Sequence, residues 1–187
     1  AAPEAAATPR PAGWYRRTLG GGGGQTGIAI DPTDTDRVYA TTDNGGLVKS
    51  TDGGDTWLPS NNNLGNPLLG DIALDPLNPQ VLYVTAEVYS RRRSYSDEPV
   101  TGELYRSRDG GQSWEVVFAE GMGAGDGRAF GIIQWPSTRN ILLPFDPAQP
   151  GRYDQDADGL TDVIYVGGWD WDADVPDRRG GLWKSED

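Results

Sequence analysis

Cysteine and histidine are both absent from the 187-residue sequence. Their absence excludes thiol nucleophiles, Ser-His triads, imidazole bases and Cys/His zinc sites within this chain. Any acid–base chemistry therefore has to use carboxylates, tyrosine or lysine. The sequence also lacks an apolar run of membrane-spanning length and any window with a sustained helical period. We expect neither membrane insertion nor a helical fold.

Basic residues are outnumbered: Lys and Arg total 16, Asp and Glu total 28, and the net charge is -12. This charge argues against nucleic acids and anionic membranes as partners. Residues 1–13 are rich in Ala and Pro, begin with Ala1 and contain no apolar h-region. We interpret them as a mature N-terminus after signal cleavage, or as a linker. We therefore expect an exported protein, extracellular or periplasmic.

The motif Ser-x-Asp-x-Gly-x-(Thr/Ser)-Trp occurs twice, at Ser50–Trp57 and Ser107–Trp114, and a third copy begins at Ser185. Recurrence of a motif indicates a repeat architecture. Asp and Gly in the motif favour a tight turn, and the Trp offers a large apolar face for packing. We predict a structural hairpin, not a catalytic group. The residues with this structural role are Ser50, Asp52, Gly54, Trp57, Ser107, Asp109, Gly111 and Trp114.

Three sequence units align, and each contains four short apolar segments separated by turn residues. We predict an all-β protein: a β-propeller of four-stranded antiparallel blades, joined as meanders. The predicted blades are residues 27–69, 70–128 and 129–187, and residues 14–26 form an orphan strand and a Gly-rich crossover. The first strand of the third unit is assigned to residues 141–147, with residues 130–134 as the alternative.

About three blades are too few for a closed ring, which needs about four to eight. Three interpretations remain: a truncated chain, a proteolytic fragment, or a chain that closes by oligomerisation. We prefer a fragment. The expected partners therefore include the remaining blades of a longer chain, or self-association.

The repeated motif and its flanking strands resemble the Asp-box (BNR) repeat. This repeat occurs in sialidases, sortilin-type receptors, photosystem assembly factors and family 74 glycoside hydrolases. The resemblance extends over almost the whole chain after Gly13 and implies a propeller. It does not specify a function, because one fold hosts many unrelated sites.

A calcium-type loop is predicted at residues 154–162 of the third unit. Carboxylates at its positions 1, 3, 5 and 9, with Gly at position 6, suit one hard cation of the size of Ca²⁺. The alternative is a solvated acidic loop, and we favour calcium as the cofactor. The predicted ligands are Asp154, Asp156, Asp158, the carbonyl of Leu160, and Asp162.

The loops between the second and third strands are the expected ligand site. Aromatic, acidic and Arg side chains together suit a polysaccharide, and a protein ligand is the alternative. A solvated loop is equally compatible with the Arg run, and a tryptophan could instead pack between blades. The predicted binding residues are Arg91, Arg92, Tyr95, Trp169, Asp170 and Trp171.

The segments Leu19–Gly24 and Val38–Gly46 resemble the opening of family 74 xyloglucan hydrolases. The resemblance implies that Asp43 occupies the position of one of two catalytic carboxylates, in enzymes that invert configuration. Their second carboxylate lies in a second propeller, which this sequence does not contain.

Three hypotheses follow. The first is an exported, calcium-stabilised module that binds glycan or protein. The second is the N-terminal part of a family 74-like endo-glucanase or xyloglucanase. The third is a sortilin-like or assembly-factor propeller that binds peptides.

Overall fold

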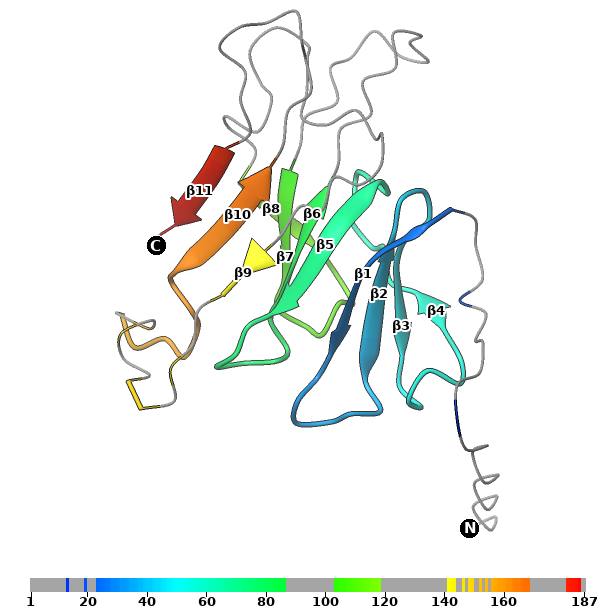
Figure 1. Ribbon diagram of the computed structural model, residues 1–187, viewed down its shortest axis with the longest axis horizontal. Helices are drawn as coiled ribbons and strands as arrows, with labels where there is room; N and C mark the ends of the chain where they lie inside the picture. Colours follow the sequence, from blue (N-terminus) through cyan, green and yellow to red (C-terminus); the bar gives the residue numbers. More distant parts are fainter. Residues whose placement is uncertain are drawn as a thin grey trace, which may run out of the picture.

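The computed structural model describes residues 13, 19, 23–86, 103–118, 141–143, 146, 148–149, 152, 154, 156–168 and 181–185. These residues form strands and turns, and no α-helix occurs among them (Figure 1). The described part of the chain accordingly has no helix of the length and apolarity needed to span a bilayer.

Three antiparallel sheets follow one another along the chain. The first contains β1 (Gln25–Ile30), β2 (Val38–Thr42), β3 (Gly46–Ser50) and β4 (Leu58–Pro59). The second contains β5 (Leu69–Leu74), β6 (Leu82–Ala86), β7 (Glu103–Ser107) and β8 (Glu115–Phe118). The third contains β9 (Ile141–Leu142), β10 (Ile164–Gly168) and β11 (Gly181–Ser185). In each sheet consecutive strands are neighbours, so each is a meander.

The sheets, called blades 1, 2 and 3 below, are arranged as part of a β-propeller. The first strands lie next to each other, β1 beside β5 and β5 beside β9, and the later strands fan outward (Figure 1). The predicted all-β fold with four-stranded antiparallel blades is confirmed. The alternative strand at residues 130–134 lies outside the described residues. So does most of the predicted orphan strand and crossover at residues 14–26, of which residues 25 and 26 belong to β1.

The second strand of each complete blade is buried along its whole length, in β2 and in β6. Short continuous apolar runs are typical of strands that are covered on both faces. Side chains alternate between the two faces of a strand, so burial along the whole length means that both faces are covered. In β2, Tyr39 and Thr41 point toward blade 2, where their hydroxyls donate to the carbonyls of Gly110 and Gly70. Burial of these central strands positions the turns at both ends of each blade.

The turn at Ser50–Trp57 is closed by its own side chains. The hydroxyl of Ser50 donates to Asp52 (2.8 Å) and accepts from the amide of Gly54 (2.8 Å). Asp52 also accepts from the amide and the hydroxyl of Thr56, at 2.8 and 2.6 Å. The carboxylate therefore ties the two sides of the turn together, which is a typical use of Asp in turns.

The turn at Ser107–Trp114 repeats this pattern. Ser107 donates to Asp109 and accepts from the amide of Gly111, both at 2.8 Å. Asp109 accepts from the amide and the hydroxyl of Ser113, at 2.9 and 2.6 Å. Equal local sequence thus produces equal local geometry in both blades.

The core lies between the blades. Between blades 1 and 2 it contains Tyr39 and Leu47 on one side and residues such as Ile72, Leu82 and Trp114 on the other. Between blades 2 and 3 it contains Tyr83 and Leu104, packed with Ile164 and Val166. Burial of these apolar faces holds the blades together.

Candidate functional site

The two ends of the blades carry different groups. The β1–β2 turn and the Ser50–Trp57 turn are adjacent, since the amide of Gly53 donates to the carbonyl of Asp36 (2.9 Å). Blade 2 repeats the contact, between Gly110 and Gln80 (2.8 Å). The β2–β3 turn, with Asp43, lies at the opposite end (Figure 1). We call these ends the box end and the Asp43 end.

Asp43 lies in a turn that is braced from both sides. The hydroxyl of Thr42 accepts from the amide of Gly45 (2.8 Å) and donates to the carbonyl of Gly46 (3.1 Å). The side chain of Asn61 accepts from the amide of Leu47 (2.8 Å) and donates to the carbonyl of Gly45 (3.0 Å). The backbone that carries Asp43 is therefore held by side chains of two segments.

The glycine run before β1 packs directly on Asp43. The amide of Asp43 donates to the carbonyl of Gly24 (3.0 Å), and the amide of Gly24 donates to Oδ1 of Asp43 (2.7 Å). Gly23 has φ +102°, and a Cβ at this position would lie 1.9 Å from Oδ1 of Asp43. Only glycine permits this approach, because any side chain would overlap the carboxylate.

The Asp43 carboxylate has one occupied and one free oxygen within the described residues. Oδ1 accepts from the Gly24 amide and from Nδ2 of Asn44 (3.2 Å). These bonds orient the group, and no described residue donates a hydrogen bond to Oδ2. The side chain is half-buried, so it is accessible at the blade edge. A fixed carboxylate with one free oxygen suits a general acid or base.

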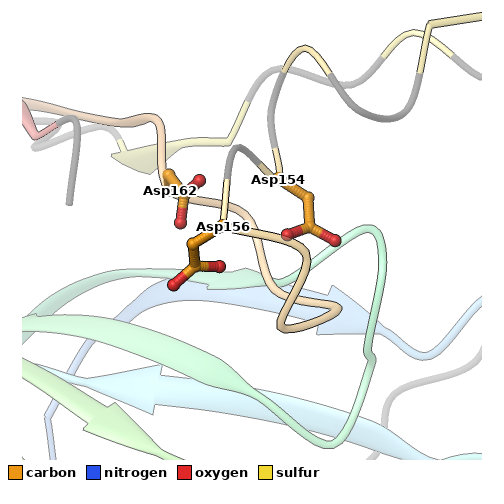
Figure 2. A group of neighbouring side chains, drawn as sticks. All are labelled: Asp154, Asp156 and Asp162. Atoms are coloured by element: carbon orange, nitrogen blue, oxygen red, sulfur yellow. The ribbon is translucent and has the colours of Figure 1, made fainter.

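The acidic loop between β9 and β10 is the second candidate site, and it lies at the box end. One carboxylate oxygen from each of Asp154, Asp156 and Asp162 lies within 4.8 Å of the other two (Figure 2). Oxygens on one Ca²⁺ lie 2.3–2.6 Å from the ion, so two of them are separated by up to about 5 Å. The three side chains are therefore spaced as three ligands of one ion could be.

Oδ1 of Asp154 is buried and has no hydrogen-bond partner in the part of the chain that the structure describes. Its other oxygen accepts from the amide of Gly159 (3.0 Å). Gly159 has φ +82°, a conformation that suits the sharp turn at position 6 of a calcium loop. A buried carboxylate oxygen without a donor is costly unless a cation satisfies it.

Asp158 is not among the three converging residues. Its Oδ1 accepts from the amide of Leu160 (2.8 Å), and the side chain is exposed. The structure thus brings together three of the four predicted carboxylates. Leu160 packs against the apolar cluster between blades 2 and 3.

The acidic loop is attached to blade 2 through Thr161. Its amide and hydroxyl donate to the two carboxylate oxygens of Asp75, at 2.8 and 3.2 Å. Asp75 is 1% exposed and also accepts from the amides of Leu77 and Asn78. A buried carboxylate with several donors is well satisfied, and it fixes the end of the loop next to Asp162.

The remaining predicted binding residues lie outside the described residues. They are Arg91, Arg92, Tyr95, Trp169, Asp170 and Trp171. Their predicted role stays a prediction.

Sequence reasoning missed two contributors to these sites. It assigned Gly23 and Gly24 to a crossover, not to contact with Asp43, and it did not include Asp75 in either site. A run of glycines close to a candidate carboxylate signals close backbone approach. No sequence signal joins Asp75 to Thr161, because they are 86 residues apart.

No protein-family model matches the sequence. The chain is similar to xyloglucanase Xgh74A of Acetivibrio thermocellus, with 32% identity over 116 residues, which are 59% of this chain and 13% of that protein. It is also similar to a xyloglucanase of Hypocrea jecorina, with 31% identity over 184 residues, 93% of this chain and 18% of that protein.

The fold is similar to the crystal structure of the GH74 xyloglucanase from Xanthomonas campestris. The TM-score is 0.52 and the identity 25%, over 95% of this chain and 21% of that one. The similarity to family 74 xyloglucanases therefore holds in sequence and in structure. The chain spans less than a fifth of the length of the two curated relatives.

Proposed function

We propose that this chain is part of a family 74-like glycoside hydrolase that acts on xyloglucan or a related β-glucan, with Asp43 as one of its two carboxylates. The observation that carries the proposal is the contact of Asp43 with the glycine run, where Gly24 binds Oδ1 and no described residue bonds to Oδ2. The similarity to xyloglucanases supports the substrate class.

Asp43 would exchange a proton through Oδ2, as the general acid for the leaving oxygen or as the base for water. In inverting glycosidases the two carboxyl groups stand about 6.5–9.5 Å apart, which leaves room for a water molecule. The resemblance places the second group in another propeller. The chain by itself would then bind a polysaccharide without cleaving it.

The test measures the release of reducing ends from xyloglucan by the full-length protein. We expect Asp43→Asn to lower kcat by about 10²–10⁴-fold, the usual share of general acid–base catalysis. Asp36→Asn, at an exposed aspartate of the box end, is the matched control and keeps full activity. Unchanged kcat in Asp43→Asn would rule out the assignment.

A second candidate function is favoured by the acidic loop: an exported Asp-box module, stabilised by calcium, that binds glycan or protein at the Asp43 end. Oδ1 of Asp154, which is buried and has no hydrogen-bond partner among the described residues, supports the calcium site. The ligands would be Asp154, Asp156 and Asp162. Without an ion, three carboxylates at this spacing repel one another, so calcium would order the loop. Export of the protein also stays a proposal.

Calcium titration tests this site through the melting temperature, with no need for activity. We expect Ca²⁺ to raise Tm in the natural chain and in Asp36→Asn, and the rise to be lost in Asp156→Asn. Asp158→Asn should keep most of the rise, because Asp158 bonds within its own turn. A Tm that does not respond to Ca²⁺ would contradict the proposal. Loss of polysaccharide binding in Trp169→Ala or Trp171→Ala, with calcium binding intact, would support these residues as part of the ligand site.

A further inference from the structure

The connection between β4 and β5, residues 60–68, supports the β2–β3 turn. Its contact is made by the side chain of Asn61, which bonds on both sides of Gly46. Oδ1 of Asn61 accepts from the amide of Leu47 (2.8 Å), and Nδ2 donates to the carbonyl of Gly45 (3.0 Å). One side chain therefore satisfies the backbone before and after Gly46.

Gly46 is shaped to receive this side chain. It has φ +74°, and a Cβ at this position would overlap the amide group of Asn61. Its own amide donates to the carbonyl of Pro67 (2.9 Å), which belongs to the same connection. A side-chain amide offers an acceptor and a donor side by side, whereas a carboxylate offers acceptors alone. The turn therefore fits asparagine and not its acidic isostere.

The residue before Asn61 is bonded to both blades. The amide of Ser60 donates to the carbonyl of Leu47 in blade 1 (2.9 Å). The hydroxyl of Ser60 donates to the carbonyl of Gly111 in blade 2, and its carbonyl accepts from Nε1 of Trp114 (2.8 Å). Ser60 thus joins the third strand of blade 1 to the motif turn of blade 2.

The residue after Asn61 is bonded to the same turn. Nδ2 of Asn62 donates to the carbonyl of Gln112 (3.0 Å), and the carbonyl of Asn62 accepts from the amide of Trp114 (3.1 Å). Each neighbour of Asn61 therefore has two hydrogen bonds to the Ser107–Trp114 turn. These bonds fix the backbone from which Asn61 reaches the β2–β3 turn, and such supporting contacts are what hold a reacting group in place.

We propose that Asn61 is a positioning residue for the Asp43 carboxylate, and that the Ser107–Trp114 turn of blade 2 holds Asn61 in this role. The inference rests on the proposed function, in which Asp43 exchanges a proton with the substrate or water. A displacement of about 1 Å at a reacting group can lower a rate about 10²-fold. The motif of blade 2 therefore supports the reacting group of blade 1, whereas Nε1 of Trp57 in blade 1 bonds within its own turn.

Kinetics of the full-length protein on xyloglucan test the role of Asn61. Asn61→Asp keeps the acceptor for the amide of Leu47 and loses the donor for the carbonyl of Gly45. We expect kcat at neutral pH to fall about 10–100-fold with KM unchanged, because Asn61 acts through the backbone. Asn61→Ala, which adds no charge, should lower kcat as well.

Asn63→Asp is the matched control for the added charge. Asn63 lies in the same connection, its side chain is exposed, and aspartate tolerates its positive φ of 62° as asparagine does. This variant is expected to keep the natural kcat and KM.

Two equal substitutions test the role of the blade 2 turn. Trp114→Phe removes the donor to Ser60 and keeps an apolar ring in the interface, so we expect kcat to fall about fivefold, the equivalent of one hydrogen bond. Trp57→Phe makes the same change in blade 1, where Nε1 donates to Gly54, and should leave kcat unchanged. Both are assayed at a temperature at which circular dichroism shows a folded protein.

Hydrogen exchange at the backbone amides of residues 43–47 follows the turn without any need for activity. It is measured by mass spectrometry on the full-length protein. We expect faster exchange in Asn61→Asp and in Trp114→Phe, because the turn opens more readily when its support is weakened. Asn63→Asp and Trp57→Phe should exchange at the natural rate.

Parallel assay of Asp43→Asn separates failure of this inference from failure of the proposed function. If Asp43→Asn lowers kcat and Asn61→Asp does not, the positioning role is wrong and the proposed function stands. Unchanged exchange in Asn61→Asp, or a rise in its KM alone, also overturns the role. Equal kcat in Trp114→Phe and Trp57→Phe overturns the part assigned to blade 2. Full kcat in Asp43→Asn refutes the proposed function, and the role of Asn61 with it.

Discussion

The turns at Ser50–Trp57 and Ser107–Trp114 share one hydrogen-bond pattern, but their tryptophans have different environments. Nε1 of Trp57 donates to the carbonyl of Gly54 in its own turn (3.0 Å), and the ring is half-buried. Nε1 of Trp114 donates to the carbonyl of Ser60 in blade 1 (2.8 Å), and the residue is 4% exposed. Among the described residues, the tryptophan of the first copy therefore bonds within its own turn, whereas that of the second copy belongs to the interface with blade 1.

The second turn also contacts blade 1 through its backbone. The carbonyl of Gly110 accepts from the hydroxyl of Tyr39 (3.2 Å) and from Nζ of Lys49 (2.7 Å). Burial raises the pKa of Tyr39 to about 12, so its hydroxyl remains a donor at neutral pH. The motif therefore forms the turn, and contact with the neighbouring blade determines whether the turn becomes part of the core.

The largest expected effect is the difference in unfolding free energy between alanine variants of Trp114 and Trp57. Trp114→Ala should lower the free energy of unfolding by about 3–5 kcal/mol, as for other buried aromatic residues. Trp57→Ala should cost about 1 kcal/mol, near the value of a single hydrogen bond. Urea denaturation measures the unfolding free energies of both variants, and we expect their m-values to be unchanged. Equal losses would show that the turn alone, without the interface, sets the contribution of the tryptophan.

A second prediction concerns the aspartates that follow the first strands. Asp75 binds Thr161 of blade 3, whereas Asp31 binds Arg37 of its own blade (2.6 Å). Asp75→Ala leaves the buried amide of Thr161 without an acceptor, so we expect a loss of about 1–3 kcal/mol in urea denaturation. The variant should also reduce the Tm response to Ca²⁺, because the acidic loop loses its attachment. Asp31→Ala should also destabilise the chain, but its Tm should still rise with Ca²⁺. Loss of the Ca²⁺ response in Asp31→Ala and its retention in Asp75→Ala would contradict the different roles of the two aspartates.

The smallest expected effect is on the stability of the fold at acidic pH, through the carboxyl group of Asp52. Hydrogen bonds from Thr56, and then from Ser50, lower the pKa of Asp52 to about 2. Because the folded pKa lies below the ordinary value of about 3.9, Asp52 stabilises the fold above pH 4, and this contribution is lost as the pH falls toward 2. Thr56→Val should raise the pKa of Asp52 and flatten the loss of stability in this range.

Asp109 provides the parallel measurement in the second turn. Burial would raise its pKa, but hydrogen bonds from Ser113 and Ser107 outweigh this effect and lower it. Ser113→Ala should therefore raise the pKa of Asp109. Carboxyl titration by NMR follows both groups, and pKa values that do not respond to the loss of the hydroxyl would show that these bonds are not the cause.

Much of the fold was predictable from the repeat. Glycine, aspartate and serine at set spacing specify the turns, and the apolar runs between them specify the strands, so the four-stranded blades follow. The acidic loop was predictable as a segment, but the choice of its converging side chains was not. Asp158 has the same spacing pattern as its neighbours, yet it bonds to Leu160 in its own turn.

Local sequence is sufficient for the turns around Asp52 and Asp109, because their hydrogen bonds join residues at most four positions apart. Three features depend on tertiary contacts instead: which copy of the motif is buried, how closely Gly23 approaches Asp43, and where the acidic loop attaches. Those contacts join residues far apart in the chain, such as Trp114 with Ser60 and Thr161 with Asp75. Their formation depends on the packing of one blade on the next, and no local pattern encodes that packing.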